Sequence, residues 1–165
     1  MLNNVKKEFE LYEPMRLWLQ DYLENKYKGW KITTIDSHAR TLDVILSEKN
    51  IICDYPQTVG LDIQIDVLGI MERGINTGIV FIEAKKNSLN LHDLGQLWAY
   101  CKLCNPLEAF LLSSKDLGSL NKIFLNLKRV DLLDFGDKKT IKKMQVGKWD
   151  VVRNTVDFAT LIPKM

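Results

Sequence analysis

The fold is decided by two apolar runs, Gly-Leu-Asp-Ile-Gln-Ile-Asp-Val-Leu-Gly-Ile (60–70) and Gly-Ile-Val-Phe-Ile-Glu-Ala-Lys (78–85). Both runs are rich in β-branched and aromatic residues, a composition that favours strands. A turn is expected from the residues that separate them: Glu72, Arg73, Gly74, Asn76 and Thr77. The stretch therefore predicts a β-hairpin.

The position of the turn predicts which residues of the hairpin face each other. If the turn is centred between Gly74 and Ile75, paired residues have numbers that sum to 149, and Asp66 faces Glu83. Side chains alternate along a strand and opposed residues share a face, so both carboxylates and Lys85 are expected on one face. Opposed acids repel each other unless a cation lies between them. The hairpin is thus a candidate metal site.

Composition indicates one ordinary globular domain spanning residues 1–165. Of the 165 residues, 46% are hydrophobic and 27% are charged, values typical of a globular protein large enough to bury a core. The sequence has no apolar run near the roughly 20 residues that a membrane span requires, and its polar N-terminus does not resemble a signal peptide. We therefore expect a cytoplasmic protein with no membrane partner.

The cysteines agree with a reducing compartment. There are three of them, an odd number, and Cys101 and Cys104 form a CxxC pair without a second pair to complete a zinc site. His38 and His92 are not at zinc-finger spacing. We interpret the CxxC pair as core packing at the end of an apolar helix.

Lysines gather near the C-terminus although the net charge is only +2. The group consists of Lys138, Lys139, Lys142, Lys143 and Lys148. Such a group suits a phosphate backbone, and it equally suits an exposed surface without a partner.

The chain before the hairpin alternates between helical and strand patterns. Apolar spacing predicts a helix over 8–28, firm from about Glu13, and then a strand over 30–35. A short helix is expected over 38–49, and a loop over 50–60 leads into the hairpin.

A second long helix is expected after the hairpin, with Asn90 as its cap and its end marked by Pro106. Its apolar stripe comprises Leu94, Leu97, Trp98 and Cys101. The later predicted elements are a buried strand (109–112), a helix (116–127), an edge strand (130–135) and a strand (149–153). This order predicts an α/β fold with a central mixed sheet flanked by helices.

These residues resemble the PD-(D/E)XK nuclease superfamily, in which an acid on one strand is followed by acid, any residue and lysine on the next. Asp66 and Glu83-Ala84-Lys85 match that pattern, although Ile65 stands where the name-giving proline would be. The next helix carries Gln96-Leu97-Trp98-Ala99-Tyr100, similar to the QxxxY signature of the RecB-like exonuclease branch. The resemblance covers about residues 10–113 and implies a restriction-endonuclease-like αβββαβ core.

The resemblance also implies a mechanism. Asp66, Glu83 and the Ala84 carbonyl would hold Mg²⁺, for which Mn²⁺ substitutes, and oxygen ligands suit such an ion. Lys85 would orient or deprotonate the attacking water. Gln96 and Tyr100, which lie on one helix face, would order the lysine and the nucleic-acid strand.

Two acidic positions have rivals. Glu13 matches the first-helix acid that many family members carry, which contacts the metal through water, and Glu8 and Glu10 are alternatives. Asp62 competes with Asp66, but the hairpin register places Asp62 opposite Asn87, beyond the Glu-Lys pair. The register therefore favours Asp66.

The expected function is metal-dependent hydrolysis of DNA. RNA is an alternative substrate, because a metal site recognises the phosphodiester rather than the sugar. A homodimer is expected if both strands are cut. The competing hypothesis is a nucleic-acid-binding or partner-docking module that has the same fold and does not cleave.

Overall fold

The computed structural model describes residues 5–164. Its α-helices are α1 (Tyr12–Lys26), α2 (Leu42–Glu48) and α3 (Leu91–Cys104). Its strands are β1 (Lys31–Asp36), β2 (Val67–Arg73), β3 (Asn76–Lys85), β4 (Glu108–Ser113), β5 (Asp134–Gly136), β6 (Ile141–Lys143), β7 (Gln145–Asp150) and β8 (Thr155–Ile162). The short helical turns are η1 (Glu8–Leu11), η2 (Ile52–Asp54), η3 (Pro56–Thr58), η4 (Lys122–Asn126) and η5 (Val130–Leu133).

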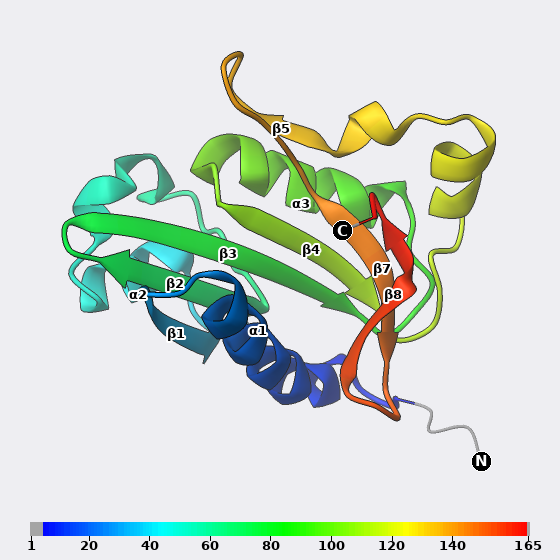
Figure 1. Cartoon of the computed structure of the whole chain (residues 1–165), viewed down its shortest axis with the longest axis horizontal. Helices are drawn as coiled ribbons and strands as arrows, with labels where there is room; N and C mark the ends of the chain where they lie inside the picture. The colour runs from blue at the N-terminus through cyan, green and yellow to red at the C-terminus, as the bar shows by residue number, and fades with distance from the viewer. Residues whose placement is uncertain (1–4, 165) are drawn as a thin grey trace.

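One six-stranded sheet forms the centre of the fold, with strand order β1-β2-β3-β4-β7-β8. Strands β3, β4 and β7 run parallel to one another, and the outer pairs are antiparallel. Helix α1 lies across one face and α3 lies against the other, as Figure 1 shows. The predicted α/β class with a mixed, helix-flanked sheet is confirmed.

The predicted hairpin register is also confirmed. Val67 pairs with Ile82 and Arg73 with Asn76, so paired numbers sum to 149 along the ladder. Gly74 has φ +62°, a left-handed conformation that glycine adopts without strain in a two-residue hairpin loop.

The predicted strand over 60–66 is wrong, because β2 begins only at Val67. The backbone before it bonds to the segment that follows β1 instead of to β3: Leu42 N–H donates to the Ile63 carbonyl at 2.7 Å, and Ser37 N–H donates to the Asp66 carbonyl at 3.0 Å. Ile63 and Ile65 are buried and Gln64 is exposed, so the apolar-polar alternation comes from an extended loop rather than a strand.

Each face of the sheet carries its own core. Met15, Leu19 and Leu23 of α1 pack with strand residues such as Val80 and Ile82. The opposite core contains the fully buried residues Leu97, Cys101 and Cys104 of α3, together with Phe81 and Leu111.

Helix α3 has the predicted cap, and one member of its predicted stripe is wrong. The Asn90 side chain accepts from Asp93 N–H at 3.0 Å, and Asp93 accepts from Asn90 N–H at 3.1 Å. Cys101 and Cys104 are core residues, as expected. Trp98, however, is 40% exposed, and its indole N–H donates to the Asp134 carbonyl at 3.2 Å.

The C-terminal half departs most from the sequence prediction. Gly118, two residues after Asp116, takes φ +53°, a left-handed conformation that interrupts a helix, so the predicted helix 116–127 is reduced to the π-helical turn η4. The predicted strand 130–135 is the turn η5 followed by the short strand β5. In the described part of the chain, no helix is both long and apolar enough to cross a membrane.

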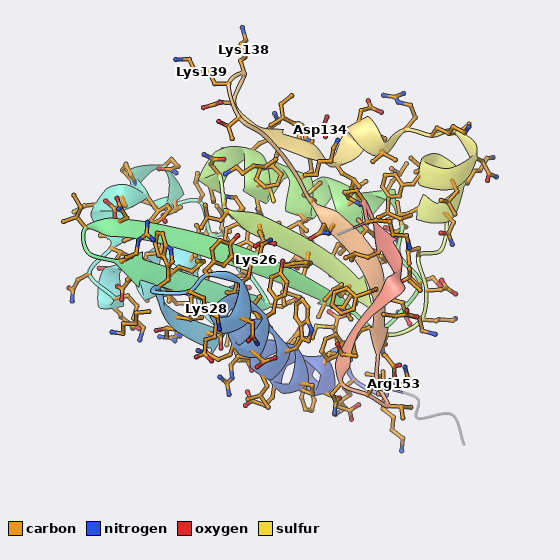
Figure 2. All side chains as sticks on the ribbon, in the orientation of Figure 1. Lys26, Lys28, Asp134, Lys138, Lys139 and Arg153 are labelled. Carbon is orange, nitrogen blue, oxygen red and sulfur yellow. The ribbon has the colours of Figure 1, made fainter. Side chains whose placement is uncertain are left out.

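The lysines that are close in sequence separate in space. Lys138 and Lys139 occupy the projecting tip of the β5–β6 hairpin, as Figure 2 shows. Lys148 lies in β7, inside the central sheet. The group is therefore not one continuous basic surface.

Candidate functional site

The acidic and basic residues predicted for the site meet at the open end of the β2–β3 hairpin. Asp66 immediately precedes β2, and Glu83 and Lys85 are near the end of β3. Along β3, Ile79 and Phe81 belong to the core on the α3 side, so alternation directs Glu83 and Lys85 to that same side.

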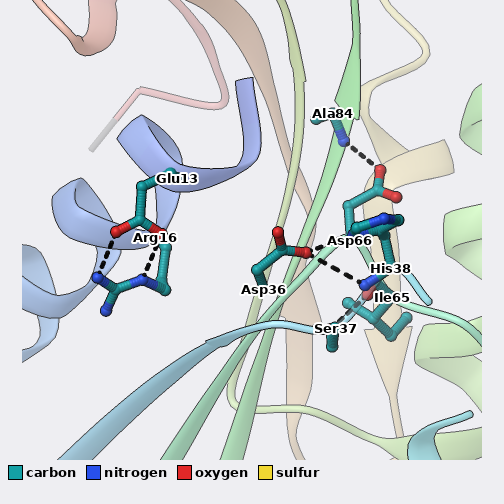
Figure 3. Close-up of polar contacts among 8 residues, drawn as sticks. All are labelled: Glu13, Arg16, Asp36, Ser37, His38, Ile65, Asp66 and Ala84. Atoms are coloured by element: carbon teal, nitrogen blue, oxygen red, sulfur yellow. Dashed lines mark hydrogen bonds and ion pairs between the residues drawn. The ribbon is translucent and has the colours of Figure 1, made fainter. Parts of the chain in front are cut away.

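An N–H of β3 and the residue directly after β1, Ser37, hold Asp66 in place. Its Oδ2 accepts a hydrogen bond from Ala84 N–H at 2.8 Å, which joins it to β3 (Figure 3). Ser37 fixes the adjoining backbone: its hydroxyl donates to the Ile65 carbonyl while its N–H donates to the Asp66 carbonyl at 3.0 Å. Ser37 was not predicted from the sequence, because nothing local indicates that it reaches residues 65 and 66.

Glu83 is a buried carboxylate with an unsatisfied oxygen. The residue is 4% exposed, and its Oε1 has no hydrogen-bond partner among the residues that the structure describes. Burial raises the pKa of Glu83 well above its usual range, and the nearby Asp66 charge raises it further. Leaving a buried acceptor unpaired is unfavourable, so this oxygen fits a ligand position.

Asp66 shares the same electrostatic environment. Burial raises the pKa of Asp66, while the Ala84 N–H and the Lys85 ammonium oppose that rise. Lys85 likewise opposes the rise for Glu83. One lysine therefore stabilises the charged forms of two neighbouring carboxylates.

A third acid at this end of the sheet comes from η1. Glu8 Oε2 accepts from Lys86 N–H at 3.3 Å, and the Glu8 charge contributes to the raised pKa of Asp66. Glu8 therefore lies within electrostatic reach of Asp66.

The other two acids of this region are engaged elsewhere. Glu13 binds the Arg16 guanidinium with its two oxygens at 2.6 and 2.8 Å, and its side chain is 60% exposed. Figure 3 shows this pair on α1, apart from Asp66 and Ala84. Glu10 accepts from Lys6 N–H at 3.1 Å at the start of η1. Among Glu8, Glu10 and Glu13, Glu8 is therefore the acid that lies near Asp66, whereas the helix turn that carries Glu13 directs it toward Arg16. Which of them contacts a metal stays a prediction.

Tyr12 links the acids to a second polar pair. It is 7% exposed, and its pKa is raised by burial and by the charges of Asp66 and Glu8. Its ring lies 4.8 Å from that of His38, centroid to centroid, and His38 Nδ1 lies 2.5 Å from Asp36 Oδ1. No pattern in the sequence predicts this contact between α1 and the segment after β1.

Gln96 and Tyr100 interact with each other. Gln96 Nε2 donates to the Tyr100 hydroxyl at 3.3 Å on the outer side of α3. Among the described residues, neither forms a hydrogen bond with Lys85. The next residue, the buried Cys101, has a pKa raised mainly by burial, with a smaller contribution from the Glu83 charge, so α3 passes near Glu83.

Asp62 stands apart from this group. It is exposed and has φ +51° in the loop before β2. In the described part of the chain, residue 62 belongs to no strand, so the predicted pairing of Asp62 with Asn87 is wrong and Asp62 does not join the group around Glu83.

The donors suit a cation that retains several waters. Within residues 5–164, no group of three or more His, Cys, Asp and Glu side chains is placed to hold a metal on its own. Mg²⁺ commonly uses one or two carboxylates and takes its remaining ligands from water and substrate phosphates. The orphaned Glu83 oxygen beside Asp66 matches that smaller requirement.

Comparisons with protein-family models, curated proteins and solved structures found no match.

Proposed function

We propose that this chain is a metal-dependent nuclease that hydrolyses phosphodiester bonds in DNA. The supporting observation is the buried Glu83 carboxylate, which lies beside Asp66 and Lys85 and has one oxygen without a hydrogen-bond partner within residues 5–164. A buried acid beside a half-buried one is unfavourable in the absence of a cation, so a fold that retains both is best explained by a use for them. The resemblance to the PD-(D/E)XK pattern supports the same function.

The proposed ligands are oxygen atoms of Asp66, Glu83 and the Ala84 carbonyl, with Glu8 contacting the ion through water in place of Glu13. The cation is Mg²⁺, and Mn²⁺ substitutes for it. When bound, such an ion polarises the scissile phosphate and lowers the pKa of an attacking water.

The remaining steps belong to side chains of this chain. The Ala84 N–H fixes Asp66, which limits the reorganisation required when substrate arrives. Lys85 orients the attacking water. In its neutral form it would take that water's proton, and as the ammonium it offsets charge that develops on the phosphate. Gln96 and Tyr100 steady the nucleic-acid strand from the surface of α3.

The element order supports a restriction-endonuclease-like core. In this proposal α1, β1, β2, β3, α3 and β4 form the αβββαβ unit, and α2 is an insertion between β1 and β2. A homodimer is proposed for cutting both strands. A cytoplasmic location suits the three free cysteines.

A digestion panel tests the activity. Linear, circular, single-stranded and branched DNA, with RNA as a further substrate, are incubated with the protein and Mg²⁺, and EDTA is added to a parallel set. We expect DNA to be degraded or nicked with Mg²⁺ and to stay intact with EDTA. Cleavage that persists in EDTA contradicts the metal mechanism, and preferential loss of RNA reassigns the substrate.

Calorimetry separates cleavage from the non-cleaving alternative. Mn²⁺ is titrated into the wild type and into the Asp66→Ala/Glu83→Ala double variant. The nuclease proposal expects binding by the wild type that the double variant lacks. Identical traces would favour a docking module that has the fold without the metal.

A further inference from the structure

A row of polar residues runs across the three parallel strands beside Lys85. Lys85 of β3 pairs with Ser113 of β4, and Ser113 pairs with Lys148 of β7. Two residues earlier on each strand, and on the same face of the sheet, Glu83, Leu111 and Val146 form the neighbouring row. Leu111 and Val146 belong to the core on the α3 side, so Lys148 projects from the same face of the sheet as Lys85. Adjacent strands are about 4.8 Å apart, which separates the two lysine backbones by about 10 Å.

Lys148 is not committed to an ion pair. Within residues 5–164 no carboxylate lies within 4.0 Å of its ammonium, and the side chain lines a surface hollow of about 240 Å³ with Thr160 and Asn121. Asp116 also lines this hollow, but its Oδ1 accepts from Gly118 N–H at 2.9 Å. Asp157, opposite Lys148 on β8, accepts from Ala159 N–H at 3.2 Å.

Ser113 fixes the segment between the two lysines. Its hydroxyl donates to the Asn87 carbonyl at 2.7 Å and accepts from Lys115 N–H at 3.0 Å. The exposed Lys115 is therefore held at the end of β4, between the ends of β3 and β7. Each of the three parallel strands thus presents a lysine in or just beyond the same end of the sheet.

We infer that Lys115 and Lys148 bind phosphates of the DNA strand that is cut beside Lys85, so that the backbone crosses the sheet from β3 toward β7. This inference rests on the proposed nuclease function and assigns the path of its substrate. A DNA strand carries one negative charge at every nucleotide, so a backbone that crosses the row offers phosphates to its lysines. Lysine ammonium groups bind phosphates as point charges, which suits sequence-independent contact.

The β5–β6 hairpin supplies the matched control. Lys138 and Lys139 at its tip are exposed and point away from the sheet (Figure 2). Lys142, lower on the hairpin, donates to the Pro106 carbonyl at 2.7 Å, and Lys143 pairs with Asp134. These lysines are not part of the row.

The test measures DNA affinity without cleavage. Binding of a short fluorescent duplex is followed by anisotropy in EDTA, at salt concentrations from about 50 to 200 mM. The variants are Lys148→Gln, Lys148→Arg and the double control Lys138→Gln/Lys139→Gln. Circular dichroism melts check that each variant is folded.

We expect Lys148→Gln to bind the duplex more weakly than the wild type does. Raising the salt from about 50 to about 200 mM should also cost the variant about 3.5-fold less affinity than it costs the wild type, because one phosphate contact has been removed. Lys148→Arg should restore the wild-type salt dependence, and the hairpin control should match the wild type. Wild-type behaviour of Lys148→Gln, or a larger effect of the hairpin control, overturns the inference and leaves the nuclease proposal standing. A wild type that neither binds nor cleaves DNA removes both.

Discussion

Replacing Glu83 by glutamine should have opposite effects on two quantities. It should raise the stability of the metal-free protein at high pH, and it should reduce the stabilisation that metal provides. Glutamine has the shape of glutamate but cannot carry its charge. Because burial and the Asp66 charge raise the pKa of Glu83, the carboxylate contributes most to folding stability when it is protonated, below the unfolded-state pKa of about 4.3. That contribution is lost as pH rises through the higher folded-state pKa.

The magnitude follows from linkage. Each unit by which the folded-state pKa exceeds the unfolded-state value lowers the free energy of unfolding by about 1.4 kcal/mol at high pH. In EDTA, wild type and Glu83→Gln should be closest in stability near about pH 4, and the variant should gain on the wild type as pH rises. Metal should reverse this order: at a concentration of 100 times Kd, binding stabilises the wild type by about 2.7 kcal/mol, or about 5 to 11 °C in Tm for a chain of this size.

Urea unfolding across pH and thermal melts with Mn²⁺ measure both effects. In Glu83→Gln we expect little Mn²⁺-induced shift, since one of the two carboxylate ligands is gone. A wild type that gains stability over the variant as pH rises in EDTA would contradict the raised pKa of Glu83. Equal stabilisation of the two proteins by Mn²⁺ would contradict the role of Glu83 as a metal ligand.

Further substitutions test the choice of Glu8 over Glu13, the choice of Asp66 over Asp62 and the hydrogen bond of Ser37. Glu8→Gln should weaken Mn²⁺ binding about 10- to 100-fold by calorimetry, as the loss of an outer ligand does, whereas Glu13→Gln should bind Mn²⁺ with wild-type affinity. Weaker Mn²⁺ binding by Glu13→Gln than by Glu8→Gln would restore Glu13 to the site. Asp66→Asn should abolish nicking of plasmid DNA while Asp62→Ala should not, and equal losses would show that the hairpin geometry does not discriminate between the two acids. Ser37→Ala should lower the free energy of unfolding by about 1 to 3 kcal/mol because the Ile65 carbonyl loses its buried partner, and an unchanged urea midpoint would argue against that bond.

The hairpin was predictable because its register depends only on local information. Gly74 in a two-residue loop sets the pairing of every residue from Val67 to Ile82, and one-residue slips are excluded by the apolar alternation. The same alternation wrongly predicted a strand over residues 60–66. Whether an extended segment pairs depends on a distant partner, here the Ser37 region, and no local pattern reports that.

The site was predictable to the same extent as the hairpin. Asp66, Glu83 and Lys85 follow from the register, but Glu8 required the position of η1 relative to the end of β3. The pairing of Glu13 with Arg16, three residues later, is a local signal that the sequence does contain. The parallel pairing of β4 with β7, which brings Lys148 into the row of Lys85, joins segments more than 30 residues apart and has no signature in either strand.

The most direct test of the nuclease proposal is the rate at which Lys85→Ala nicks supercoiled DNA in Mg²⁺, measured beside the wild type and Lys28→Ala. Lys28 is an exposed lysine between α1 and β1, so its removal changes the net charge equally without touching the site. We predict that Lys85→Ala still unfolds in one cooperative transition and loses about 10²- to 10⁴-fold in rate, while Lys28→Ala cleaves normally. A folded Lys85→Ala protein that cleaves at the wild-type rate contradicts the proposed mechanism.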